Sequence, residues 1–211
     1  SVKYTGQMAR HALHDSLKAL VKTGDVEKMM SYYKGEDGLS IIAPASKGDF
    51  VIKQSMISEI GSGNLSGKTY KGLIPGWGNL TGPEVLEHMM TKAGEVEGGF
   101  DPSTGFDYTQ LISKFTMGAV FYNQAVNSYL GSKMEIGSKP NNKPYKDGAY
   151  YTGKEHSWDE AFGYWGSAAH ALTLSAEENY NVAKKKDMAS ADYNADGVVD
   201  LYSEFTYAHA Y

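Results

Sequence analysis

Apolar side chains recur every three or four residues along much of this chain, which is the spacing of one face of an α-helix. Near the start, Met8, Leu13, Leu17 and Leu20 follow this spacing beside several polar residues. No segment shows the sustained apolar–polar alternation of a half-buried strand. The pattern predicts helices over six ranges, which are 4–21, 25–33, 83–93, 107–130, 155–174 and 176–186.

Residues at the ends of these ranges support the assignment. Asp25 and Thr81 can cap the first free N–H groups of a helix, and Pro83 suits a first helical turn. Gly118 lies in the middle of the longest predicted helix, where glycine costs about 1 kcal/mol relative to alanine. We therefore expect Gly118 to pack closely against a neighbouring helix.

Long polar, glycine-rich segments separate the predicted helices. The two longest of these segments are residues 34–82 and 131–153, which are expected to form mostly irregular loops. Tyr122 and Val126 belong to the broad apolar face of the longest predicted helix. The sequence thus predicts an all-α bundle with long irregular loops, folded as a single domain over residues 1–211.

Composition argues against several functional classes. The net charge is −5, from 20 Lys and Arg against 25 Asp and Glu, and without a basic patch we expect no nucleic acid as a partner. No apolar run reaches the roughly 20 residues of a membrane span. The absence of cysteine excludes thiolate metal sites and suits an oxidising compartment. Because the chain opens at Ser1 without Met, we expect that a signal sequence has been removed. Together with the absence of cysteine, this favours an extracellular or periplasmic protein.

The segment DYNADGVVDLYSE, residues 192–204, has the spacing of a calcium-binding loop of the EF-hand or dockerin type. Such a loop takes oxygen ligands from positions one, three, five, seven and nine, with a glycine at position six where the chain turns sharply. Gly197 occupies that sixth position. The ligands predicted by this register are Asp192, Asn194, Asp196, the carbonyl of Val198 and Asp200.

The end of this loop departs from the usual pattern. Position twelve, where a bidentate acid is expected, is Ser203, and Glu204 follows one residue later. We expect Glu204 to reach the calcium ion in a modified geometry and a final helix to start near Leu201. The alternative is an Asx-rich turn that caps this final helix without an ion.

A second group of ionisable residues lies in EHSWDEAFGYWG, residues 155–166. If the segment is helical, His156 lies one turn from both Asp159 and Glu160. An imidazole and a carboxylate make half of an iron or zinc site, with further ligands supplied by other helices. The alternative is a buried hydrogen-bond network, in which aromatic rings exclude water and Lys114 of the longest helix pairs with one of these acids.

No motif of a catalytic class accompanies these residues. The metalloprotease pattern H-E-x-x-H is absent, because the segment reads H-S-W-D-E. The G-x-S-x-G nucleophile elbow, the phosphate loop and the dinucleotide fingerprint are also absent. We therefore expect a protein that is not an enzyme.

Three stretches resemble a known family, and they begin at Gly6 (GQMARHALHDSLKAL), Gly105 (GFDYTQLISKFTMGAVFYNQAVNSYL) and His156 (HSWDEAFGYWG). Together with the loop at 192–204 they resemble an uncharacterised bacterial envelope family, a domain of unknown function that is often secreted or lipoprotein-anchored. Its most specific mark is H-x-W-D-E-A-F-G-Y-[FW]-G. This family is remotely similar to imelysin-like proteins, which are helical bundles of the bacterial periplasm or surface associated with iron uptake. Their H-x-x-E metal motif corresponds here to His156 and Asp159, so the resemblance implies an imelysin-like bundle with a metal site.

Two functions are expected from these observations. The first is a secreted or periplasmic metal-associated binding protein, imelysin-like, that acquires iron or another divalent metal and is stabilised by calcium. The second is a non-catalytic, calcium-stabilised cell-surface or matrix protein that binds other envelope or surface proteins. A metallopeptidase with Glu160 as the base is a third alternative, suggested by the wider imelysin group. The expected cofactors are calcium and either iron or zinc.

Overall fold

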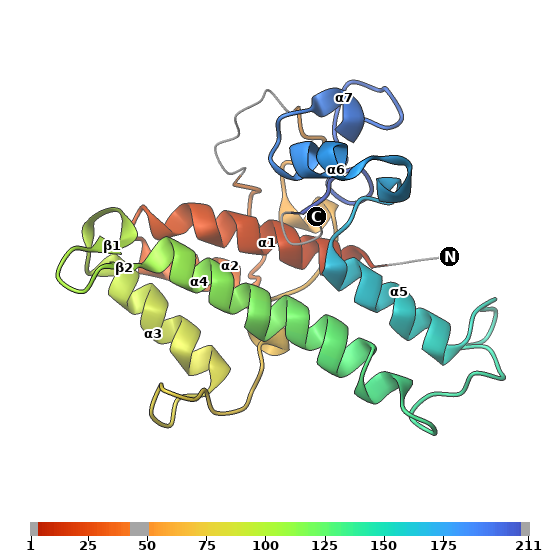
Figure 1. The fold of residues 1–211 in the computed structure, drawn as a ribbon, viewed down its shortest axis with the longest axis horizontal. Helices are drawn as coiled ribbons and strands as arrows, with labels where there is room; N and C mark the ends of the chain where they lie inside the picture. The colour runs from red at the N-terminus through yellow and green to blue at the C-terminus, as the bar shows by residue number, and fades with distance from the viewer. Residues whose placement is uncertain (1–3, 43–50, 208–211) are drawn as a thin grey trace.

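Helices make up most of the computed structural model, which describes residues 4–42 and 51–207 (Figure 1). The longer helices are α1 (Thr5–Val21), α2 (Val26–Lys34), α3 (Gly82–Gly94), α4 (Tyr108–Thr116), η4 (Met117–Tyr129), α5 (Gly153–Trp165) and α6 (Ala176–Ala183). The shorter ones are α7 (Met188–Ala191), η1 (Ile57–Glu59), η2 (Ser66–Lys68), η3 (Glu97–Gly99), η5 (Ser132–Met134) and η6 (Ala171–Thr173). The expected all-α class is confirmed. Within the described ranges, none of the helices is long and apolar enough to cross a membrane.

Helix α1 lies at the centre of the bundle, where it packs against α2, α4 and α5. Helix α3 covers α2 and α4, and α5 runs along η4 (Figure 1). A two-stranded hairpin, β1 (Phe100–Asp101) and β2 (Phe106–Asp107), precedes α4 and was not predicted. One hydrophobic cluster joins side chains from Tyr4 to Tyr207.

Several polar side chains of α1 are buried together with its apolar ones. Gln7, His11, His14 and Ser16 are each at most 5 % exposed. A buried polar group is destabilising unless it is hydrogen bonded. His14 Nε2 lies 3.2 Å from the Ser113 carbonyl, and Ser16 Oγ accepts from a loop N–H group at 3.0 Å. These bonds fix the position of α1 relative to the segments around it.

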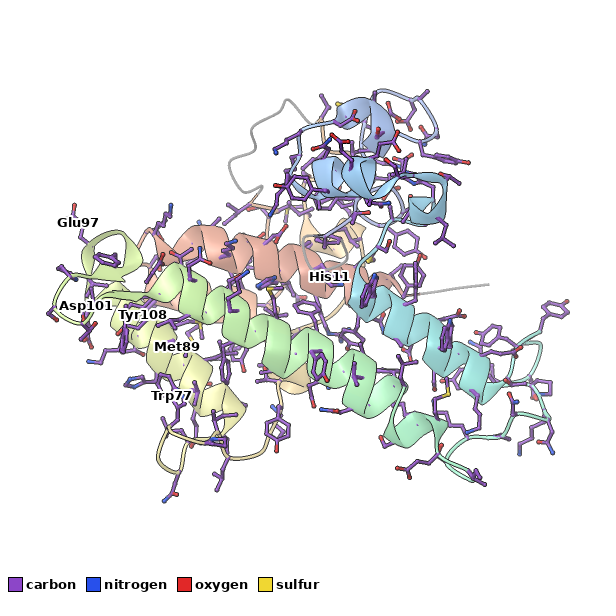
Figure 2. All side chains as sticks on the ribbon, viewed as in Figure 1. His11, Trp77, Met89, Glu97, Asp101 and Tyr108 are labelled. Atoms are coloured by element: carbon purple, nitrogen blue, oxygen red, sulfur yellow. The ribbon has the colours of Figure 1, made fainter. Side chains whose placement is uncertain are left out.

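His11 is also buried, at the point where α1 meets the C-terminal end of α5 (Figure 2). Its ring stacks on Phe121 at 4.3 Å and on Tyr207 at 4.7 Å between centroids. Its Nε2 lies 2.9 Å from the Gly163 carbonyl. His11 therefore connects α1, η4, α5 and the C-terminal segment.

The first three predicted helices are confirmed within a residue or two of their expected ends. Asp25 accepts a hydrogen bond from the Lys28 N–H at 2.9 Å and caps α2 as expected. Thr81 and Glu84 form a reciprocal capping box at the start of α3. These caps depend on local sequence, which is why the sequence predicted them.

The longest predicted helix is one rod in the structure, but its winding changes. It is an α-helix to Thr116 and a wider π-helix from Met117 to Tyr129, where the Leu130 N–H donates to the Ala125 carbonyl five residues earlier. The expected close packing at Gly118 is wrong. A Cβ atom added to this exposed glycine would meet no atom within 4 Å.

Three other expectations for helices are also corrected. Helix α5 ends at Trp165, well before residue 174, because Gly166 adopts a left-handed conformation with φ 79°. An added Cβ there would lie 2.7 Å from the His11 ring, so both conformation and space require glycine. Helix α6 ends at Ala183, short of residue 186. The final helix expected from Leu201 is a turn over 201–204.

Alanine substitutions at two helical glycines should change the stability of the fold in opposite directions. Gly118→Ala should raise the free energy of unfolding by about 0.5–1 kcal/mol, because alanine has the higher helix propensity and meets no neighbour. Gly163→Ala would place a methyl group 2.5 Å from Tyr4 Cβ and should lower it by more than about 1 kcal/mol. Urea unfolding measures both, and the reverse order would contradict the packing of α5 on α1.

The burial of His14 predicts a loss of stability in acid. Burial lowers the pKa of His14 to about 4, whereas the unfolded chain takes up this proton below about pH 6.5. Its contribution is therefore fully present above pH 6.5 and lost as the pH falls towards 4, with about 2 kcal/mol lost by pH 5. His14→Gln should lose less unfolding free energy than the wild type between pH 7 and pH 5. Equal losses would show that His14 does not titrate in this way.

Candidate functional site

The first half of the loop at 192–204 folds around its own polar side chains. The Asp192 carboxylate accepts hydrogen bonds from the N–H groups of Asp196 at 3.1 Å and Gly197 at 2.8 Å. Asn194 Oδ1 accepts from Asp196 at 2.9 Å, and Asp196 Oδ1 accepts from the Val198 N–H at 3.1 Å. Gly197 has φ 87°, a conformation that suits the sharp turn at position six.

Glu204 turns back across the same loop. Its Oε1 accepts from the Asn194 N–H at 3.2 Å and its Oε2 from the Asp200 N–H at 2.9 Å. The side chain is nearly buried, with the residue 4 % exposed. None of the ion pairs found among the described residues involves Glu204. The Glu204 carboxylate is thus held within the loop by two backbone N–H groups.

Asp200, the ligand predicted for position nine, is engaged outside this group. Its carboxylate pairs with Lys53 Nζ at 3.1 Å and accepts from Gln54 Nε2 at 2.8 Å. These hydrogen bonds, and the positive charge of Lys53, hold the pKa of Asp200 below its ordinary value although burial acts to raise it. The structure therefore brings Asp192, Asn194, Asp196 and Glu204 together and directs Asp200 towards residues 53–54.

Val199 of this loop is hydrogen bonded to residues 51–53, which are distant in the sequence. Buried Val199 donates its N–H to the Val51 carbonyl at 2.7 Å and accepts from the Lys53 N–H at 3.0 Å. Over residues 4–42 and 51–207, no three His, Cys, Asp or Glu side chains form a group that could hold a metal ion by themselves. The loop offers a mixed set of carboxylate, amide and carbonyl oxygens instead, which is the donor set that calcium takes.

The second predicted site is brought together only in part. His156 Nε2 lies 3.6 Å from Glu160 Oε2, one helical turn away on α5. The imidazole also packs on Tyr145, with ring centroids 4.2 Å apart. Asp159 has no hydrogen bond or ion pair with His156 among the described contacts, and burial raises its pKa. His156 and Glu160 are therefore a pair, and Asp159 interacts with both only through its charge.

Glu160 faces α1, not α4. Its Oε1 accepts a hydrogen bond from Gln7 Nε2 at 3.2 Å. The expected pairing with Lys114 is wrong, because Lys114 is exposed on α4 and the ion pairs among the described residues do not include it. The sequence shows that acids and a possible partner exist, but the rotation of α5 about its axis decides which helix they face.

The expectation that aromatic rings exclude water from the acids of α5 is also wrong, because most of these rings point outward. Trp158 is 62 % and Trp165 is 55 % exposed, and Phe162 is also exposed. Tyr164 alone among the four rings of this stretch is buried. Helix α5 thus turns its acids towards α1 and most of its aromatic rings outward.

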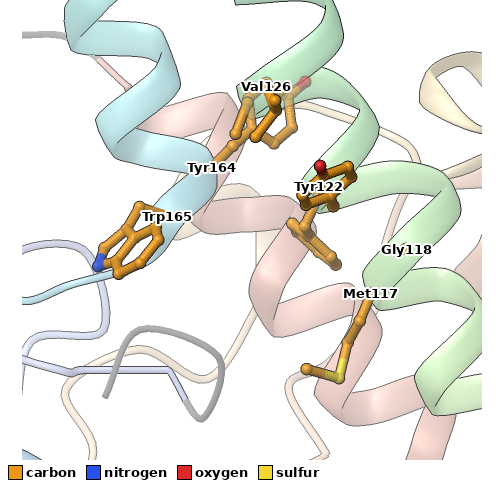
Figure 3. Close-up of a pocket in the computed structure, with 8 residues that line it drawn as sticks. Met117, Gly118, Tyr122, Val126, Tyr164 and Trp165 are labelled. Atoms are coloured by element: carbon orange, nitrogen blue, oxygen red, sulfur yellow. The ribbon is translucent and has the colours of Figure 1, made fainter. Parts of the chain in front are cut away.

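The exposed ring of Trp165 lines an apolar groove of about 390 Å³ between η4 and the C-terminal end of α5 (Figure 3). Tyr122 and Val126, assigned by sequence to the apolar face, are exposed here at 61 % and 40 %. The groove is lined by Met117, Gly118, Phe121, Tyr122, Ala125, Val126, Tyr164 and Trp165. Its sequence signal is the four-residue repeat of Gly118, Tyr122 and Val126, which periodicity alone assigns equally well to a buried stripe.

Comparison with known proteins places this geometry in a family. No curated protein and no solved structure matches the chain. The family model for Domain of unknown function (DUF4856) matches residues 88–205, more than half of the 211 residues, including α4, η4, α5 and the loop at 192–204. The chain therefore belongs to the family described as Domain of unknown function (DUF4856).

Proposed function

We propose that this protein is a non-catalytic binding protein whose C-terminal loop holds calcium as a structural ion. The observation that carries the proposal is the Glu204 carboxylate, which is nearly buried and turned back onto the N–H groups of Asn194 and Asp200, in the same loop as Asp192 and Asp196. Burying a carboxylate in a loop that carries further carboxylates is costly unless a cation is present. A hard divalent cation with oxygen ligands would remove that cost.

The donors present fit calcium. Asp192, Asn194, Asp196 and Glu204 would hold it, together with the Val198 carbonyl, while Asp200 keeps its bonds to residues 53–54. When bound, the ion supplies two positive charges and no reaction. Loops of this grade suit millimolar calcium, which agrees with the proposed extracellular or periplasmic location.

The apolar groove is the proposed binding surface. Its volume of about 390 Å³ lies within the range of about 300–1,000 Å³ that is typical of small-molecule pockets. One wall is the π-helix η4, and π-helical turns occur frequently at functional sites. We propose that the groove takes an apolar ligand, with Trp165 and Tyr122 supplying aromatic contact area.

Iron or zinc acquisition and an imelysin-like architecture stay predictions for this chain. His156 and Glu160 support half of such a metal site. Calcium is supported better, because four loop residues already share one set of hydrogen bonds whereas Asp159 does not join His156. The possible envelope or surface partners also remain predictions.

Calcium should raise the melting temperature of the wild-type protein. If about 10 mM calcium is 100 times Kd, the stabilisation is about 2.7 kcal/mol, which corresponds to an increase of about 5–10 °C for a chain of this size. Calorimetry in calcium, in magnesium and in chelator measures the effect, and magnesium should give a smaller shift. Equal melting temperatures in calcium and in chelator would contradict a calcium-binding loop.

The variant Asp196→Asn separates charge from hydrogen bonding. Asparagine keeps the Oδ1 acceptor for the Val198 N–H but removes one negative charge from the loop. In chelator the variant should be at least as stable as the wild type, and its gain from calcium should fall by more than half. Asp147→Asn, at an exposed acid outside the loop, is the matched control and should keep the full calcium response.

The two exposed tryptophans of α5 test the groove. Trp165 lines it, whereas Trp158 is exposed on the same helix but is not among the lining residues. Trp165→Ala should weaken binding of the apolar dye anilinonaphthalene sulfonate several-fold, by about 1 kcal/mol or more, and Trp158→Ala should leave it unchanged. Fluorescence titration measures both. Equal effects would show that the dye does not report on the groove.

A further inference from the structure

Three cations, carried by α1, η2 and η5, interact electrostatically with the same group of residues as Glu160 of α5. They are Arg10, Lys68 and Lys133, each partly exposed. None of the three forms an ion pair among the described residues. The chain as a whole carries −5, so three cations around one carboxylate reverse the sign of the charge locally.

These groups are close enough to shift one another's pKa. Burial lowers the pKa of Lys133 to about 8, Glu160 acts to raise it, and Lys139 and Lys68 lower it further. Burial also lowers the pKa of Lys68, and the Arg10 guanidinium lowers it further against the opposing effect of Glu160. Repulsion among the cations thus remains although Glu160 acts against it.

Arg10 is held in place with most of its donors free. Its Nε donates to the Asn64 carbonyl at 2.9 Å, and its Cζ lies 5.8 Å from the centre of the Tyr164 ring. The guanidinium packs on the backbone at Gly63, where an added Cβ would lie 3.2 Å from Cζ. Nε has the only protein acceptor that the described residues provide for this guanidinium, so its other N–H groups can bind a ligand.

Two tyrosines complete the cluster. Lys133 Nζ sits 3.2 Å from the centre of the Tyr129 ring, and the Tyr129 and Tyr164 rings are 5.5 Å apart. The Tyr164 hydroxyl is buried without a hydrogen-bond partner among the described residues, and both Arg10 and Glu160 act on its pKa. An unsatisfied buried hydroxyl is costly, and an oxygen atom of a ligand would satisfy it.

We propose that Arg10, Lys68 and Lys133 form a binding site for a phosphate group, with the Tyr164 hydroxyl as an additional donor. Three cations against one carboxylate match a phosphate of charge about −1.5 to −2 better than a carboxylate ligand of charge −1. A guanidinium with free N–H groups binds phosphate oxygens in pairs. Glu160 keeps its contacts with Gln7 and His156. The site is separate from the loop at 192–204 and shares Tyr164 with the apolar groove.

Titration calorimetry of the full chain with inorganic phosphate, at constant ionic strength against chloride, tests this site. We expect a Kd below about 1 mM for phosphate and no heat of binding for chloride. A parallel titration uses phosphatidylcholine vesicles with and without phosphatidic acid. Binding to inorganic phosphate identifies a soluble ligand, and binding to the phosphatidic acid vesicles alone identifies a lipid headgroup. Binding to neither overturns the proposal.

Variants assign the binding to these residues. Arg10→Gln and Lys133→Gln should each weaken phosphate binding about tenfold or more. Lys114→Gln, at an exposed lysine of α4 outside the cluster, is the matched control and should bind like the wild type. Circular dichroism confirms that each variant is folded. Equal weakening by Lys114→Gln would show that the attraction is non-specific and would overturn the proposal.

Tyr164→Phe keeps the proposal testable if the charge variants do not fold. It removes a hydroxyl that has no hydrogen-bond partner within residues 4–42 and 51–207, so the melting temperature without phosphate should not fall. Phosphate affinity should fall several-fold, because the ligand loses one donor. Wild-type affinity in Tyr164→Phe, with a wild-type melting temperature, would remove Tyr164 from the site and contradict the proposed geometry.

Discussion

The stacking of the His11 imidazole between Phe121 and Tyr207 is the interaction on which the arrangement of this protein depends. The imidazole is fully buried, and its Nε2 meets the Gly163 carbonyl at 2.9 Å. Two stacked rings and one hydrogen bond around a single side chain leave little freedom for the segments that supply them. Helix η4, the C-terminal end of α5 and the C-terminal segment are therefore fixed relative to α1.

The loop at 192–204 and the C-terminal end of α5 are both tied to this contact. The Tyr207 N–H donates to the Gly166 carbonyl at 2.8 Å, and its hydroxyl donates to the Leu201 carbonyl at 3.2 Å. The loop at 192–204 is therefore held at two points. Tyr207 binds its Leu201 carbonyl, and Val199 of the loop binds the backbone of residues 51–53. A loop attached at two points changes little when an ion binds, which keeps the entropic cost of binding small.

The sequence predicted the features that depend on neighbouring residues. The caps at Asp25 and Thr81 and the turn at Gly197 each follow from residues within one helical turn or loop, and all three are present. The hydrogen bonds of Asp192 and Asp196 within their loop are local in the same way. Ion binding by that loop remains a prediction.

Features that depend on the rotation of one helix against another could not be predicted in this way. A helical pattern shows that Tyr122, Trp158 and Glu160 lie on particular faces, but not which face meets α1. The π-helical winding of η4 has no periodic signal of its own, since residues four apart share a face in either winding. The apolar groove and the cation cluster around Glu160 both arise from these non-local choices, and for that reason neither was found from the sequence.

The most direct measurement of the central claim is amide hydrogen exchange in the wild type and in His11→Gln, which removes the stacked ring and keeps a polar side chain. The account predicts that exchange at the Tyr207 amide, which donates to Gly166, becomes about tenfold faster, whereas amides within α3 change much less. An unchanged Tyr207 amide, or an equal acceleration in α3, would show that His11 does not hold the C-terminal segment to the bundle.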